Sequence, residues 1–218
     1  MKTLIILLCI FVVGCSNAYN SNNYVVSGAP DEQGLYELSG TNFDSVRVES
    51  KSKLGSYSVV YFEPLNTTDL IIDDRRLHSS DKPWVFGSKE HERLSRMLSD
   101  ITTKLFDAST GIALSMEPTP NSLTASIKLI KFTPSASKDE PRNRGIGDKI
   151  YTLSVGELKA RVLLKDSTTG EIVGIINDSE EVGDSPWLER NDRPNNTREI
   201  RLTMSDWVRS LKSVLEAE

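Results

Sequence analysis

Residues 156–177, GELKARVLLKDSTTGEIVGIIN, contain the clearest structural pattern in this chain. Apolar and charged side chains alternate along residues 157–164, which is the period of a strand with one buried face. The following stretch DSTTGE predicts a turn, because Asp166 can bond the backbone ahead of it and Gly170 can take a left-handed conformation. Residues 171–177 then return as a second strand, so the segment predicts an antiparallel hairpin.

The flanking segments predict further strands and two helices. Residues 57–63 are rich in valine and aromatic residues, which favours a strand, and residues 112–116 and 123–132 predict two more. A helix is predicted from Ser88, with one apolar face formed by Leu94, Met97, Leu98, Ile101 and Leu105. A second helix is predicted from Thr203 as its cap, with an apolar face formed by Met204, Trp207, Val208, Leu211, Val214 and Leu215.

The order of these elements predicts the fold class. Val46 and Val48 alternate as a short entry strand, and the remaining order is strand, helix, several strands and helix. Leu153 and Val155 are out of phase with the strand after them, so Gly156 is predicted to mark a β-bulge. We expect an α+β two-layer sandwich, with an antiparallel sheet of about four to five strands and two main helices on one face.

Residues 1–14 have the features of a bacterial lipoprotein signal peptide. Lys2 supplies a positive start, and the apolar run of ten residues from Leu4 to Val13 is too short for a transmembrane helix, which needs roughly 20. The run ends in VVGC (12–15), which resembles a lipobox. This resemblance implies cleavage before Cys15 and lipidation of that cysteine. The alternative is an ordinary secreted protein with a chance cysteine near its cleavage site.

The lipobox also implies a location and a domain order. Ser16 stands where enteric inner-membrane lipoproteins carry aspartate, which indicates the bacterial outer membrane and a protein facing the periplasm. Residues 15–34 are rich in asparagine, serine and glycine and predict a flexible tether after the lipidated cysteine. Residues 35–218 are long enough for a single α+β domain.

Cysteine content and charge exclude other classes of protein. The only two cysteines are Cys9 in the signal and Cys15 at the lipid site, so no disulfide is expected in the mature chain. The formal net charge is −5, with both signs mixed along the sequence. This charge argues against nucleic acid as a partner. The expected contact with a membrane is therefore made by the lipid on Cys15.

The hairpin and the last helix resemble a known family. Residues 156–181, GELKARVLLKDSTTGEIVGIINDSEE, and residues 204–215, MSDWVRSLKSVL, are similar to bacterial lipoproteins of the domain of unknown function 3313 family. Residues that match this family's turn and its Asp-Trp pair are Asp166, Ser167, Thr169, Gly170, Glu171, Asp206 and Trp207. The resemblance covers roughly residues 55–217 and implies the fold and location. It implies no activity, because the family's own function is unassigned.

Catalytic motifs are absent from the sequence. HERLS (91–95) begins like a zinc-protease helix but lacks the second histidine. Asp73, Asp74 and His78 form the one set that suggests a metal-dependent or hydrolytic envelope enzyme, and a solvated acidic turn is the alternative. No phosphate-binding loop, dinucleotide fingerprint or nucleophile elbow occurs. We therefore expect no metal, no cofactor and no enzymatic activity.

Two long loops, residues 134–149 and 183–201, indicate binding instead. Tryptophan and arginine are favoured at binding hot spots, whereas the alternative for Trp187 is packing against the edge of the sandwich. The candidate binding residues are Trp187, Arg190, Arg193, Arg142 and Arg144. We expect a binding or accessory lipoprotein with an envelope protein complex or envelope material as its partner, and a passive structural lipoprotein is the alternative.

Overall fold

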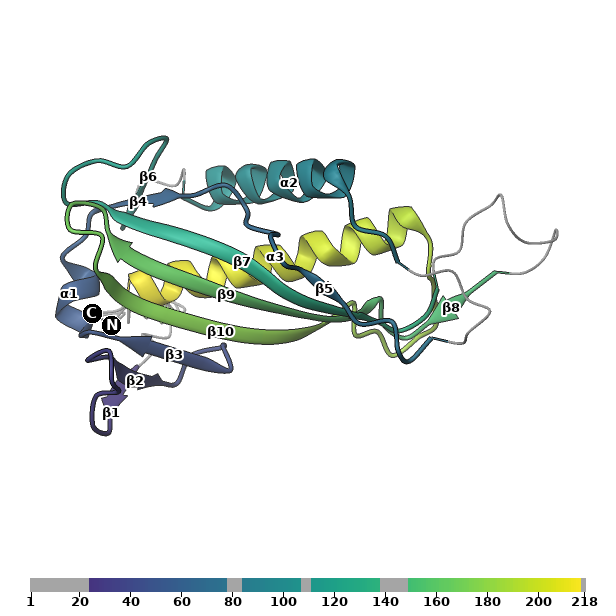
Figure 1. Cartoon of the computed structure of the whole chain (residues 1–218), viewed down its shortest axis with the longest axis horizontal. Coiled ribbons are helices and arrows are strands. Elements are labelled where there is room, and N and C mark those ends of the chain that lie inside the picture. The colour runs from purple at the N-terminus through teal and green to yellow at the C-terminus, as the bar shows by residue number, and fades with distance from the viewer. Residues whose placement is uncertain (1–23, 78–83, 107–110, 138–148, 217–218) are drawn as a thin grey trace, which may run out of the picture.

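The computed structural model describes residues 24–77, 84–106, 111–137 and 149–216. Within these ranges, nine strands form one sheet, two strands form a separate ribbon, and there are three helices (Figure 1). The strands of the large sheet are β1 (Val25–Ser27), β2 (Tyr36–Ser39), β3 (Ser45–Val48), β4 (Val59–Phe62), β5 (Ile71–Ile72), β6 (Ala113–Ser115), β7 (Leu123–Pro134), β9 (Gly156–Asp166) and β10 (Ile172–Val182). The ribbon and the helices are β8 (Tyr151–Thr152), β11 (Glu189–Arg190), α1 (Lys51–Gly55), α2 (Ser88–Phe106) and α3 (Arg193–Leu215).

The predicted antiparallel sheet of four to five strands with two helices is wrong. The strand order is β1-β2-β3-β10-β9-β7-β4-β6, and β5 also pairs with β7. β4 and β5 pair with β7 in parallel, and β6 pairs with β4 in parallel, so the sheet is mixed. The chain passes through α2 between β4 and β6, and a crossover of this length allows parallel neighbours. A period-two pattern predicts a strand but not its direction.

The core lies between the long strands and the two long helices. Figure 1 shows α2 and α3 side by side along β7, β9 and β10. The predicted face of α2 is buried at Leu94, Met97, Leu98 and Ile101 and partly buried at Leu105. The alternating apolar positions of β9 are buried, and they are Leu158, Ala160, Val162 and Leu164. β3 is buried through Val46 and Val48, as predicted, and pairs with β10. No helix within the described ranges is long and apolar enough to cross a membrane.

The β9–β10 hairpin and its turn are confirmed. One carboxylate oxygen of Asp166 accepts from the backbone N–H groups of Thr168 and Thr169 at 2.8 and 3.0 Å, and Gly170 has φ +75°. The other oxygen accepts from the Tyr57 hydroxyl at 2.8 Å and from Lys53 Nζ at 3.4 Å. Asp166 therefore joins the hairpin turn to α1 and to the segment before β4.

Asp166→Asn is expected to destabilise the fold at neutral pH and to have a smaller effect in acid. The Thr169 N–H, the Tyr57 hydroxyl and the Thr168 N–H hold the pKa of Asp166 below its usual range. Because the folded-state pKa is depressed, the ionised carboxylate stabilises the fold above the unfolded pKa of about 3.9, and this stabilisation is lost as the pH falls below it. Urea unfolding at neutral pH and at about pH 3 measures both effects. The prediction would be contradicted if the difference in unfolding free energy between wild type and Asp166→Asn were the same at both pH values.

The domain begins before residue 35. Val25–Ser27 lies inside the segment predicted as a tether, but it forms β1 and pairs with β2. Tyr24 is buried, and its hydroxyl lies 2.9 Å from Ser213 Oγ in α3. Of the predicted tether, residues 24–34 are thus part of the domain, while the signal peptide and Cys15 lie outside the described residues.

α3 begins well before its predicted cap. The N-cap is Asp192, whose side chain accepts from the Asn195 N–H at 3.1 Å, and Pro194 lies in the first turn. Thr203, the predicted cap, is buried in the helix interior. The predicted loop 183–201 therefore contains β11 and the first turns of a helix rather than one continuous loop.

Candidate binding surface

The β8–β11 ribbon exposes large apolar side chains. It lies at one end of the long axis, beyond the long strands, whereas α1 and β1 lie at the other end (Figure 1). Its exposed apolar side chains, with the fraction of each that is exposed, are Trp187 (77%), Leu188 (64%), Leu153 (53%) and Tyr151 (50%). We call these four residues the ribbon patch. Large apolar side chains grouped on one short ribbon are typical of an interaction surface.

Backbone contacts position the two strands of the ribbon. Tyr151 pairs with Arg190 and Thr152 pairs with Glu189 in antiparallel register. The Ser185 N–H donates to the Leu153 carbonyl at 3.0 Å, which extends this pairing beyond the two strands. Within the ribbon patch, Tyr151 and Leu153 therefore have paired backbone, whereas Trp187 and Leu188 lie in the segment that leads into β11.

Two buried asparagines attach the ribbon to the domain. Asn191 is 1% exposed, and its side-chain N–H groups donate to the carbonyl of Ser137 at 3.0 Å and to that of Ala136 at 3.4 Å. Its side-chain oxygen accepts from Asn196 Nδ2 at 2.7 Å. Since Ala136 and Ser137 follow β7 and Asn196 belongs to α3, this network links the base of the ribbon to both. Sequence reasoning missed both asparagines, and no periodic pattern marks them.

Cationic side chains lie beside the ribbon patch. Arg190 belongs to β11 and forms an ion pair with Asp192 at 3.4 Å. Arg193 is the first residue of α3 and is exposed. Arg198 pairs with Glu189 and with Glu199. Both signs of charge are thus present around the apolar side chains, as in the polar rim of many protein interfaces.

The structure places the predicted binding residues unequally. Arg190 belongs to β11 and Arg193 is the first residue of α3, whereas Trp187 lies two residues before β11. The alternative in which Trp187 packs against the edge of the sheet is wrong, because most of its side chain is exposed. Arg142 and Arg144 lie outside the described residues.

The acidic set proposed for an enzyme contains one carboxylate that is already paired. Both oxygens of Asp73 accept from Arg75, at 2.7 and 2.8 Å, and Lys131 Nζ lies 2.6 Å from the second oxygen. Arg75, and then Lys131, hold the pKa of Asp73 below its usual range. The Asp74 carbonyl accepts from the Leu77 N–H, and His78 lies outside the described residues. Asp73 therefore acts as a structural ion-pair residue that joins the segment after β5 to β7.

Comparison with known proteins gives low similarity. No family model and no curated protein matches the chain. A PelC dodecamer from Paraburkholderia phytofirmans shares 13% identity over 79% of this chain and 98% of that chain, with a TM-score of 0.38. A Xanthomonas campestris protein of family DUF330 shares 9% identity over 88% of this chain and 93% of that chain, with a TM-score of 0.40. Similarity at this level does not indicate a shared function. Neither of these two proteins is described as a member of the domain of unknown function 3313 family, which the sequence resembles.

Proposed function

We propose that this chain is a lipoprotein of the bacterial outer membrane that faces the periplasm and binds an envelope protein complex through the ribbon patch. The exposed indole of Trp187 is the observation that carries this proposal. Rigid aromatic side chains contribute large contact area at low entropic cost, and tryptophan is enriched at binding hot spots. Membership of the domain of unknown function 3313 family is part of the same proposal, and the resemblance of the Asp166–Glu171 turn supports it.

The proposed anchor and the ribbon patch lie at opposite ends of the domain. Cys15 precedes Tyr24 by nine residues, a length that spans at most about 30 Å. Tyr24 contacts Ser213 near the end of α3, far from the ribbon (Figure 1). A lipid on Cys15 would therefore hold the domain by the end opposite the ribbon patch, which would point away from the anchoring membrane.

Cys15→Ala is expected to release the protein from the outer membrane. The wild-type chain should carry acyl mass on Cys15 and sediment with outer membrane, because two or more acyl chains anchor a protein stably. The variant should lose this mass and move to the soluble fraction. Membrane fractionation with intact mass measurement checks both. A wild-type chain that is soluble and unmodified would contradict the proposed lipid anchor on Cys15. This result would leave the proposed binding role of the ribbon patch open to its own test.

Trp187→Ser is expected to weaken partner binding about 30-fold or more without lowering stability. Loss of a hot-spot side chain costs about 2 kcal/mol or more of binding energy, whereas an exposed substitution changes the unfolding free energy by about 0.5 kcal/mol or less. A photo-crosslinking residue at position 187 in intact envelopes first captures and identifies the partner. The affinity of the purified partner is then measured with both chains.

Met116→Ser is the matched control for this prediction. Met116 is 86% exposed and follows β6, away from the ribbon. Its variant should bind the partner like wild type, and a crosslinker at position 116 should not capture it. Equal capture from positions 116 and 187, or unchanged affinity in Trp187→Ser, would refute a binding role for the ribbon patch.

A further inference from the structure

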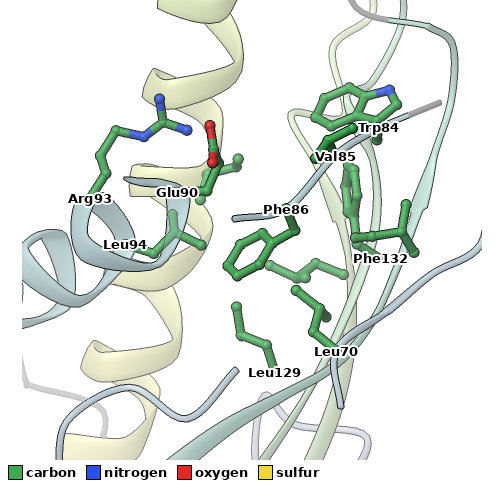
Figure 2. A pocket seen from close by; sticks show the side chains of 12 residues that line it. Leu70, Trp84, Val85, Phe86, Glu90, Arg93, Leu94, Leu129 and Phe132 are labelled. Carbon is green, nitrogen blue, oxygen red and sulfur yellow. The ribbon is translucent and has the colours of Figure 1, made fainter. Parts of the chain in front are cut away.

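An apolar pocket lies at the start of α2, between this helix, α3 and the sheet. Figure 2 shows side chains from several segments converging on it, and its volume is about 60 Å³. Its apolar lining includes Leu70, Phe86, Leu94, Leu129, Phe132 and Ile200. Phe132 is held in place by an edge-on contact with Trp84, with ring centroids 4.9 Å apart. The pocket is thus a defined apolar space that sequence analysis did not suggest.

Arg93 gives this pocket an unsatisfied donor. Arg93 Nε is buried, and it is the one side-chain nitrogen or oxygen among the described residues that is buried without a hydrogen-bond partner. Leaving a buried donor unpaired is unfavourable, so native structures rarely retain one without a reason. The guanidinium belongs to the lining of the pocket, and Figure 2 shows it at one margin, apart from the apolar side chains.

Glu90 is the other charged residue of the lining, and it is already engaged. Its Oε2 accepts from the Gly87 N–H at 3.2 Å, ahead of the first turn of α2. A carboxylate near a helix N-terminus is favoured there by the helix dipole. Glu90 thus accepts a hydrogen bond at the start of its own helix, whereas Arg93 Nε has no acceptor within the described residues. An acceptor group on a ligand would satisfy Arg93.

We propose that the pocket binds a small anionic amphiphile, with a single alkyl chain among the apolar side chains and a carboxylate or phosphate head on Arg93. Guanidinium groups recognise both head groups well. A cavity that accepts benzene has a volume of about 150 Å³, whereas this pocket has about 60 Å³. The pocket is therefore too small for a ring and favours a slender alkyl chain. This site is separate from the ribbon patch, and its role does not depend on the function proposed above.

The test measures binding of alkyl carboxylates, alkyl phosphates and alkyl alcohols of about one to six carbons by titration calorimetry. The full chain with Cys15→Ala is used, so that no anchor lipid competes. Affinity should rise about fourfold per methylene until the pocket is full and then level off. At equal chain length, an anionic head should bind at least about tenfold more tightly than the alcohol. Preference for the phosphate series assigns the site to a phosphate head group, as in a lipid phosphate, and preference for the carboxylate series assigns it to a carboxylate head group, as in a fatty acid.

Three variants test the assignment of residues. Arg93→Gln should remove the preference for an anionic head and leave alcohol binding unchanged. Arg96→Gln, an exposed arginine on the same helix, is the matched control and should bind like wild type. Val85→Trp should block both ligand classes, because Val85 lines the pocket and is largely exposed. Its thermal unfolding is followed to show that the fold persists.

Three results would overturn the proposal. The first is the absence of saturable binding by every probe at millimolar concentration. The second is equal affinity for anionic heads and alcohols in the wild-type chain. The third is an anion preference that Arg93→Gln leaves in place.

Discussion

Trp207→Ala is expected to lower the unfolding free energy by about 3–5 kcal/mol, the range for a large aromatic residue truncated in a core. Trp207 is 7% exposed and belongs to the hydrophobic core between the sheet and the two long helices. Its indole N–H donates to Asp178 Oδ2 in β10 at 2.6 Å, so the side chain both fills the space under α3 and ties this helix to the sheet. Since small domains have about 5–15 kcal/mol in total, the variant would lose a large part of its stability.

The loss has two components that Trp207→Phe separates. Phenylalanine keeps most of the buried apolar volume but removes the N–H donor, and Asp178 would retain the Asp44 N–H, at 2.9 Å on its other oxygen, and the backbone N–H of Ser179. A buried acceptor left without its partner costs about 1–3 kcal/mol. Trp207→Phe should therefore be destabilised by less than Trp207→Ala but by more than a volume-conserving exchange.

The pH dependence of Trp207→Phe identifies the hydrogen bond. Burial raises the pKa of Asp178 above its usual range, even with the indole in place. Losing the donor should raise this pKa further, because the charged form loses stabilisation. For an acid with a raised folded-state pKa, stability increases as the pH falls through that pKa. The deficit of Trp207→Phe relative to wild type should therefore be smaller at about pH 4, close to the ordinary pKa of an aspartate, than at about pH 8.

Urea unfolding of the wild type and both variants at these two pH values measures the effects. Equal deficits for the alanine and phenylalanine variants would show that packing contributes little. A deficit independent of pH would show that the Asp178 contact does not stabilise the carboxylate.

The hairpin was predictable because local residues determine it. Alternation along β9 matches its burial pattern, and the turn depends on Asp166 and Gly170 themselves. The sequence alternates through Leu123, Ala125, Ile127 and Leu129 and changes phase at Ile130. This change has a structural basis, since the register of β7 against β9 shifts between Leu129 and Lys131. These features need no knowledge of distant contacts.

The sheet and the ribbon were not predictable in the same way. The direction of β4 relative to β7 depends on how the chain returns after α2, which no local pattern records. β8 and β11 have two residues each, too few to show a period, and their support comes from the buried Asn191–Asn196 contact. The start of α3 did carry a signal, because Asp192 followed by Pro194 is a typical helix N-terminus.

Gly156 lies where the phase change before it predicted a β-bulge, and the hydrogen bonds agree with this prediction. The Val155 N–H donates to the Val182 carbonyl at 2.8 Å, and Gly156, the first residue of β9, pairs with the same Val182 and with Pro134 on its other side, so two residues face one. The φ of Gly156 is +147°, and a Cβ there would lie 2.4 Å from the Thr133 carbonyl oxygen. Glycine is required because the backbone of β7 passes so close.

Gly156→Ala is accordingly expected to destabilise the fold by about 2–6 kcal/mol, from backbone strain and a clash of comparable size. The Cβ would also lie 2.8 Å from Pro134 Cα, and neither backbone atom can rotate away as a side chain can. Gly170→Ala is the matched control, because Gly170 has φ +75° with nothing within 4 Å of a Cβ, which leaves strain of about 1–2 kcal/mol alone. Urea unfolding compares the two. Equal losses of unfolding free energy in the two variants would contradict the prediction. They would mean that β7 moves away from a Cβ at position 156 at little cost, so that the close approach is not what requires glycine.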